Sequence, residues 1–109
     1  MQTYHYVLAS SKYLLEDEPL PEVIEERQRY YKEKGKDLDF WLVQQPAFVE
    51  TVAMAEIKAK CPQPCTAVIS TNQQFIQWLK LRLEYVYVGQ FDAPNSDIPD
   101  ATASLASVS

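Results

Sequence analysis

The amino-acid sequence predicts an α+β domain in which helices pack around an antiparallel or mixed sheet of about four strands. Three observations lead to this fold class. Strand-like apolar segments take turns with segments whose apolar residues recur at helical spacing, and the connections between them are short. The first and last strand-like segments look half exposed, which is more typical of antiparallel or mixed sheets. A chain of 109 residues forms one domain with one core.

One strand and one helix are predicted before residue 36. Residues 4–9 alternate and carry aromatic and β-branched side chains, which favours an extended strand. A helix is predicted from Leu20, because Pro21 suits the first helical turn, glutamates precede lysines, and Gly35 is a typical stop. Its apolar stripe consists of Leu20, Val23, Ile24, Arg27, Tyr30 and Tyr31.

The middle of the chain predicts a buried strand and a short helix. Residues 38–45 form a nearly continuous apolar run closed by Pro46, as a well-buried strand does. Residues 47–60 repeat apolar side chains at a weaker helical period, which has to end by Pro62. We therefore expect the second strand to be followed by a short helix.

The last part of the chain predicts two strands, one helix and a tail. Residues 65–70 and 84–91 are strand-like. The apolar face of the helix between them consists of Phe75, Ile76, Leu79 and Leu83. The candidates for its N-cap are Ser70, Thr71 and Asn72. Residues 1–91 are thus the expected globular domain, and residues 92–109, acidic and rich in Pro, Ser and Ala, the expected mobile tail.

Composition and charge exclude several functions. The net charge of −5 argues against nucleic-acid binding, which needs a basic surface. Two glycines are too few for phosphate-binding loops of the Walker or dinucleotide type. The sequence has no apolar run of roughly 18 residues and no signal peptide after Met1, so we expect an intracellular protein without a transmembrane segment.

Residues with catalytic or metal-binding chemistry are scarce. The single histidine, His5, cannot build a multi-histidine metal site, and we expect it to be structural. Cys61 and Cys65 are separated by three residues, one more than in the redox motif. They either pack as free thiols or take part in a metal site or disulfide shared with a partner chain. We expect no catalytic residue, no metal and no cofactor.

Two places are candidate functional sites. Asp39 precedes a buried-looking apolar run, where it is either a turn or helix-terminus partner or a functional residue. In the third predicted helix, Trp78 and Arg82 lie on a flank outside the apolar face, near Leu81 and Tyr85. Exposed Trp and Arg side chains dominate the energetics of protein interfaces, but they equally cover the edge of a sheet.

Four segments resemble one known family. They begin YHYVLAS, DFWLVQQPAF, CPQPCTAVISTN and DIPDATASL, and span residues 4–10, 39–48, 61–91 and 97–105. The pattern is similar, over nearly the whole chain, to the cyanobacterial and plastid family called hypothetical chloroplast open reading frame fifty-four. Cys65 departs from the small residue common in that family, which weakens a paired role for the two cysteines.

The resemblance implies an accessory or assembly factor of chlorophyll biosynthesis and not an enzyme. Such proteins serve the aerobic magnesium-protoporphyrin IX monomethyl ester oxidative cyclase, which closes the fifth ring to give protochlorophyllide. The implied partners are its catalytic di-iron subunit and other chlorophyll-biosynthesis enzymes. The implied place is the cytoplasm or plastid stroma, with membrane association only through partners. The implied fold is a compact antiparallel sheet with helices around it.

The resemblance also implies a set of site residues. On the matching positions, Asp39, Phe40 and Arg82, with Ala9 beside them, belong to a partner-facing or partner-shaping surface. Trp78 joins them from the exposed helix flank. The chain cannot itself hold the di-iron centre, because it has no Glu-x-x-His pairs.

Two alternatives stay open. In the first, the protein is a tetrapyrrole-binding or substrate-handling subunit of the same enzyme, with an aromatic pocket and with Arg82 pairing a porphyrin propionate. In the second, it is an unrelated small α+β interaction domain.

Overall fold

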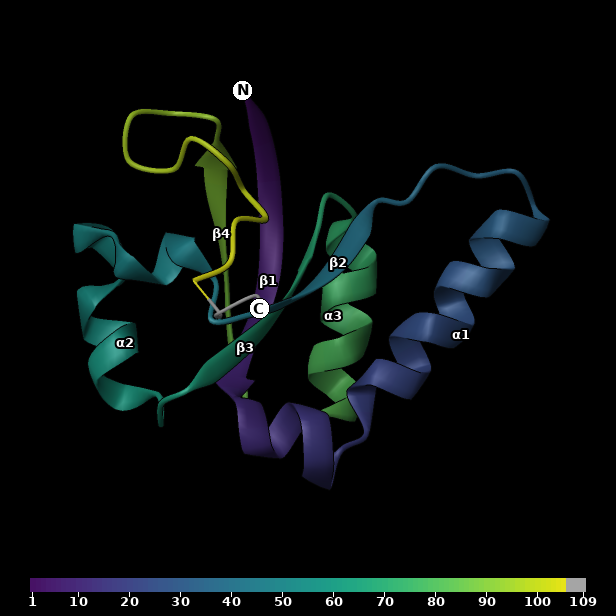
Figure 1. Ribbon diagram of the computed structural model, residues 1–109, viewed down its shortest axis with the longest axis horizontal. Coiled ribbons are helices and arrows are strands. Elements are labelled where there is room, and N and C mark those ends of the chain that lie inside the picture. Colours follow the sequence, from purple (N-terminus) through teal and green to yellow (C-terminus); the bar gives the residue numbers. More distant parts are fainter. Residues whose placement is uncertain (106–109) are drawn as a thin grey trace.

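The protein is a three-layer structure built on one antiparallel sheet, and the computed structural model describes residues 1–105 of the 109. Helices α1 (Leu20–Glu33) and α3 (Gln73–Arg82) cover one face of the sheet (Figure 1). Helix α2 (Ala55–Lys60) and the C-terminal segment lie on the other face. The predicted α+β class with a four-stranded antiparallel sheet is confirmed.

The four strands are ordered β2-β3-β1-β4, and neighbours run antiparallel. β1 (Gln2–Ser10) and β3 (Cys65–Ser70) are central, whereas β2 (Phe40–Gln44) and β4 (Tyr87–Ala93) form the edges. β3 occupies the range that the sequence predicts, while β1 is longer and β2 shorter. Because β3 has a strand on each side and a layer on each face, all of its residues are buried.

Both ends of α1 follow the signals in the sequence. Pro21 lies in the first turn. At the other end Gly35 adopts a left-handed φ of 68°, which suits glycine. Its N–H donates to the carbonyl oxygen of Lys32 at 3.2 Å, and the N–H of Lys36 donates to that of Tyr31 at 2.9 Å, the paired bonds of a Schellman motif. The predicted stop at Gly35 is confirmed.

Asn72 is the N-cap of α3. Its Oδ1 accepts a hydrogen bond from the N–H of Phe75 at 3.2 Å, which satisfies one of the free donors of the first turn. The Ser70 hydroxyl supports the cap by accepting the N–H of Asn72 at 2.9 Å. The predicted apolar face of this helix is confirmed by the burial of Phe75, Ile76, Leu79 and Leu83.

The sheet separates two apolar cores, because successive strand residues point to opposite faces. On the side of α1 and α3 the buried side chains include Val7, Ala9, Phe40, Val68, Phe75 and Leu79. On the side of α2 they include Tyr6, Leu8, Phe48, Met54, Ile69 and Ile98. The predicted alternation of the first strand between two faces is confirmed, but its expected half exposure is wrong, because β1 lies between β3 and β4 and residues 6–9 are buried on both faces.

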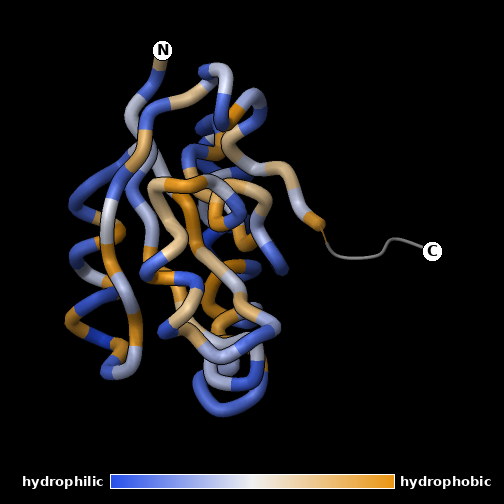
Figure 2. Tube along the Cα trace, turned by 90° about the vertical axis from the view of Figure 1, so that its left-hand side faces the viewer, coloured by the Kyte–Doolittle hydropathy of each residue, from blue (hydrophilic) through white to orange (hydrophobic). Residues whose placement is uncertain are grey.

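Apolar and polar residues follow one another at short intervals along the trace (Figure 2). Within residues 1–105, no helix is both long enough and apolar enough to cross a membrane. The buried apolar residues of the two cores come from all four strands, from α1 and α3 and from the connecting segments. Helix α2 adds the partly buried Ile57.

Residues 47–60 differ from the single short helix that was predicted. They form two 3₁₀ turns, Ala47–Glu50 and Val52–Met54, before α2. Thr51 separates the turns because its backbone is extended, with φ −75° and ψ 157°. Its hydroxyl donates to the carbonyl oxygen of Phe48 at 2.9 Å. The spacing of apolar residues does not report such a local break.

The last strand begins at Tyr87 and so lies further along the chain than the predicted 84–91. The N–H of Glu84 donates instead to the Tyr13 hydroxyl at 3.0 Å, which draws this stretch away from the sheet. Tyr13 begins a single π-helical turn, Tyr13–Asp17, that the sequence did not predict.

The segment 94–105, which the sequence assigns to a tail, runs back over the α2 side of the sheet (yellow in Figure 1). Ile98 and Ala101 are buried there. The predicted boundary between residues 91 and 92 falls inside β4, so the packed body extends beyond the expected domain. The rest of the predicted tail, 106–109, lies outside the described residues.

Candidate functional site

An open groove runs between α1 and α3 on one side of the sheet. Its volume is about 300 Å³, and we call it the α1–α3 groove. It is lined by Val23, Glu26, Arg27, Tyr30 and Trp78. The groove exists because the short side chain of Val23 and the half-exposed rings of Tyr30 and Trp78 leave the space between the two helices unfilled.

Two large side chains of α3 continue this surface outward. Trp78 is 47% exposed, and its ring is held almost parallel to that of Phe75, with 6.1 Å between the ring centroids. Arg82 follows one helical turn later, with its guanidinium carbon 5.8 Å from the centroid of Trp78. Leu81 is 88% exposed. Together with the groove, Leu81 and Arg82 form what we call the α1–α3 surface, the type of apolar surface that marks interaction sites.

Arg27 forms the floor of the groove. Its guanidinium carbon lies 4.2 Å from the ring centroid of Phe75, 5.2 Å from that of Tyr31 and 5.5 Å from that of Phe40. One of its nitrogens, Nη2, donates to the Tyr31 hydroxyl at 3.3 Å. Its Nε is buried and has no hydrogen-bond acceptor among the described residues.

Phe40 and Ala9, predicted for the partner surface, are core residues. Phe40 is fully buried, with its ring centroid 5.2 Å from that of Tyr31 and 5.3 Å from that of Phe75. Ala9 is 2% exposed in the same core. Because both side chains are buried, they fit the partner-shaping and not the partner-facing role that the resemblance implies.

Asp39 joins the start of β2 to the end of β3. Its carbonyl oxygen accepts the Ser70 hydroxyl at 2.7 Å and the N–H of Thr71 at 3.0 Å. Its carboxylate oxygen Oδ1 is buried and finds no partner in the described part of the chain. Asp39 and Arg82 do not form an ion pair. The ion pairs within residues 1–105 are Lys12–Asp17, Lys58–Glu50 and Lys60–Glu56.

The cysteines lie on the opposite side of the sheet and are buried free thiols. Burial raises the pKa of Cys61 to about 11, and the neighbouring Cys65 thiol adds to the shift. Burial also raises the pKa of Cys65. Thiols with raised pKa values are poor nucleophiles, which favours the packing role. In the described part of the chain no three or more His, Cys, Asp or Glu side chains are grouped to hold a metal ion.

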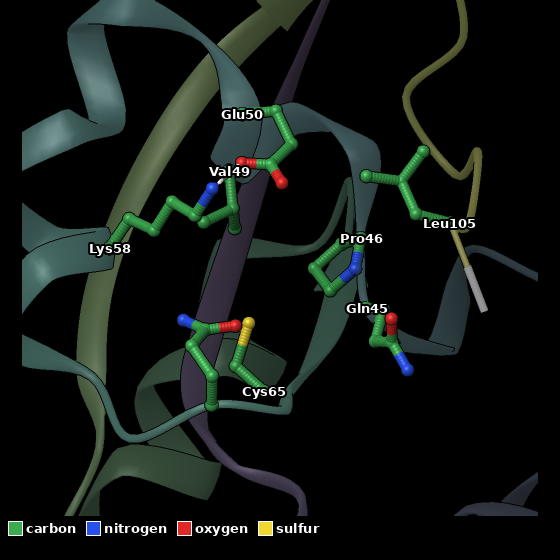
Figure 3. Close-up of a pocket in the computed structure, with 8 residues that line it drawn as sticks. Gln45, Pro46, Val49, Glu50, Lys58, Cys65 and Leu105 are labelled. Carbon is green, nitrogen blue, oxygen red and sulfur yellow. Dashed lines mark hydrogen bonds and ion pairs between the residues drawn. The ribbon is translucent and has the colours of Figure 1, made fainter.

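A second, smaller pocket lies near Cys65 (Figure 3). The ion pair of Lys58 with Glu50 crosses one end of it, and Leu105 closes another side. Its volume is about 40 Å³, room for a water molecule or two and not for an organic ligand.

The structure thus brings some of the predicted site residues together and leaves others apart. Trp78 and Arg82 share one exposed flank, and Phe40 and Ala9 lie in the core beneath, while Asp39 stands at a strand end. Sequence reasoning missed Arg27. The signal was present, because an arginine within an otherwise apolar helical stripe has to be accommodated by a special contact.

Known proteins match this chain over most of its length. Residues 2–93 match the family model described as Ycf54 protein. The "Ycf54-like protein" of Synechocystis sp. is 57% identical over 105 residues, which cover 96% of this chain and 79% of that protein. "Protein YCF54, chloroplastic" of Arabidopsis thaliana is 37% identical over 95 residues, which cover 86% of this chain and 44% of that protein.

A solved structure gives the same result for the fold. The X-ray structure of the All0216 protein from Nostoc sp. PCC 7120 is 63% identical to this chain. It superposes with a TM-score of 0.94, covering 96% of this chain and 97% of that one. The resemblance stated from the sequence motifs is therefore confirmed, and the chain belongs to the Ycf54 family.

Proposed function

We propose that this protein is a non-catalytic accessory and assembly factor for the aerobic magnesium-protoporphyrin IX monomethyl ester oxidative cyclase. It acts by binding the catalytic di-iron subunit of that enzyme, and it reaches other chlorophyll-biosynthesis enzymes and the photosynthetic membrane only through such partners. Membership of the Ycf54 family supports this assignment. The relative named as chloroplastic supports the plastid stroma as the place in plastid-bearing cells.

One observation carries the binding role. Trp78 is 47% exposed and Leu81 is 88% exposed, although both belong to a helix whose other large apolar side chains are buried. Removing such side chains from water is favourable, and Trp and Arg are among the residues enriched at the energetic hot spots of protein interfaces. Contact of the α1–α3 surface with a protein partner is therefore lower in free energy than its contact with water.

The test is direct binding of the full chain to the purified catalytic di-iron subunit. We expect a stoichiometric complex, and we expect Trp78→Ala to weaken it by about 2 kcal/mol or more while the melting temperature stays close to that of the wild type. Gln77→Ala is the matched control, because Gln77 is an exposed neighbour on the same helix. Failure of the wild-type chain to bind the subunit would refute the proposal.

A second candidate function is the handling of tetrapyrrole. The observation that favours it is the aromatic lining of the α1–α3 groove beside two arginines, Arg27 and Arg82, which suit a flat ring and its propionate. The groove volume of about 300 Å³ is at the lower limit for small-molecule sites, so the protein-binding role is favoured. Titration of the purified protein with magnesium-protoporphyrin monomethyl ester separates the two, because a spectral shift at stoichiometric concentrations supports pigment binding.

A further inference from the structure

Arg27 is a cation that packs among aromatic rings and has no anionic partner within residues 1–105. Three aromatic rings surround its guanidinium group, the nearest being Phe75 at 4.2 Å. Their faces attract a cation, which favours this position of the side chain. The charge therefore has a preferred position before any partner arrives.

The hydrogen-bonding capacity of Arg27 is largely unused. A guanidinium group has five N–H donors, and within the described residues Arg27 makes one hydrogen bond, to the Tyr31 hydroxyl at 3.3 Å. The buried Nε has no acceptor among residues 1–105, and none of the ion pairs of this part of the chain includes Arg27. A buried donor without an acceptor costs free energy, which an incoming acceptor recovers.

The space in front of Arg27 is the α1–α3 groove. Its remaining walls are the apolar or aromatic side chains of Val23, Tyr30 and Trp78, together with Glu26. Glu26 is exposed, so its repulsion of an incoming anion is screened by water and salt. A carboxylate that enters between the rings meets the guanidinium group in a partly dehydrated place, where a charge-assisted hydrogen bond is strong.

We infer that Arg27 is the anchor of the α1–α3 surface and binds an Asp or Glu side chain that the partner protein inserts, with flanking apolar residues, into the groove. Charge complementarity favours this occupant. The Arg27 guanidinium group, which forms no ion pair within residues 1–105, suits a carboxylate, and the aromatic walls suit apolar neighbours. The inference rests on the proposed function, because it names the contact through which the catalytic di-iron subunit is held.

The experiment measures the dissociation constant of the complex with the purified di-iron subunit for three variants of the full chain. Arg27→Met keeps an apolar stem over Phe75 but removes the charge, and we expect the dissociation constant to rise by about 30-fold or more. Arg27→Lys keeps the charge without the planar fork, and we expect an intermediate value. Arg29→Met is the control, because Arg29 is exposed on the same helix and the change in net charge is identical.

Two further measurements separate an anchor from a merely structural arginine. Affinity of the wild type should fall as salt is raised, and that of Arg27→Met should fall less, because one charge pair has been removed. In the wild-type protein the NMR signal of the Arg27 Nε–H should shift and exchange more slowly with water when the subunit binds. This second measurement needs no variant and therefore holds even if a substitution unfolds the protein.

The outcomes distinguish the two proposals. Equal affinities of the wild type and Arg27→Met, or an Nε–H signal that does not change in the complex, would overturn the anchor role and leave the accessory function intact. Absence of binding by the wild type would refute the accessory function itself, and the anchor role with it. Loss of affinity in Arg27→Met together with a normal Arg29→Met supports both.

Discussion

The ring of Tyr6 lies directly against Gly89, its cross-strand partner in the pairing of β1 with β4. A Cβ atom at Gly89 would stand 2.6 Å from the Tyr6 hydroxyl oxygen and 2.8 Å from its Cζ. The ring cannot retreat easily, because its hydroxyl donates to the sulfur of Met54 at 3.6 Å and its centroid lies 5.0 Å from that of Phe48. Position 89 is thus a glycine because of a close approach, with no demand for unusual backbone angles.

This contact predicts that Gly89→Ala destabilises the protein. Overpacking against a confined ring costs about 1–3 kcal/mol, which urea unfolding measures as a lower free energy of unfolding. The exposed neighbour Gln90 provides the control, because Gln90→Ala should change stability little. If the ring is the cause, Gly89→Ala should cost much less in a Tyr6→Leu background, and fully additive effects of the two changes would contradict this explanation.

We expect substitution of Phe40 to lower the stability of the protein and not to remove a direct contact with a partner. It is fully buried among Tyr31, Phe75 and the guanidinium group of Arg27, so Phe40→Ala leaves a cavity that costs about 3–5 kcal/mol. Affinity for the di-iron subunit should then fall only to the extent that the α1–α3 surface is disordered or unfolded. A variant with unchanged unfolding free energy and lost binding would show instead that a partner reaches Phe40.

The elements that the sequence predicts well are those with strong local signals. Gly35 ends α1 because a left-handed residue is required there, and Asn72 caps α3 because its short side chain reaches the N–H of Phe75. The continuous apolar run before Ser70 identifies β3 correctly because both faces of a central strand are covered. In each case the information is contained in a few neighbouring residues.

The features that sequence reasoning misplaced depend on distant partners. β4 starts at Tyr87 because its pairing with β1 sets the register, while the Tyr13 hydroxyl takes the N–H of Glu84. Arg27 was counted in an apolar stripe, where an arginine signals some special contact, but the sequence does not show that the contact is with rings from β2 and α3. Phe40 was predicted to face or to shape a partner surface, and only the packing of α1 and α3 over β2 shows that its ring is fully buried.

The Cys61 thiol predicts a pH dependence of stability. Its pKa is raised from the ordinary value of 9.0 to about 11, so the folded protein holds the proton more tightly than the unfolded chain. The stabilising contribution is therefore complete below pH 9 and is lost as the pH rises toward 11. Between these pH values the wild type should lose about 2 kcal/mol more of its unfolding free energy than Cys61→Ala does. Unfolding measured on both proteins in the same buffers tests this, and parallel curves would contradict it.

Burial of residues in the segment 94–105 predicts that this segment stabilises the protein, although the sequence assigns it to a tail. Ile98 is 8% exposed within the core on the α2 side, so Ile98→Ala should lower the unfolding free energy by about 2–4 kcal/mol. Leu105 is 55% exposed, and Leu105→Ala should cost far less. Thermal unfolding of both variants measures the difference. If Ile98→Ala melts at the same temperature as the wild type, this stabilising role is wrong and the segment is dispensable for folding, as the composition alone suggests.

Arg82 gives the last prediction, in which binding and stability separate. It contacts Trp78 and forms no ion pair within the described residues, so Arg82→Ala should leave the unfolding free energy within about 0.5 kcal/mol of the wild type. Affinity for the di-iron subunit should fall by about 2 kcal/mol, since an exposed arginine stacked on a Trp is able to pair with a carboxylate of another chain.

Lys80 is the matched control for Arg82, because it is an exposed cation of the same helix. Lys80→Ala changes the net charge equally and should leave the affinity nearly unchanged apart from a small general effect of charge. The structural alternative, in which Arg82 neutralises Asp39, predicts the reverse: a lower melting temperature, with binding lost only in proportion to unfolding. Normal binding by Arg82→Ala would remove Arg82 from the α1–α3 surface, and the partner contact would then have to lie nearer Arg27 and the groove.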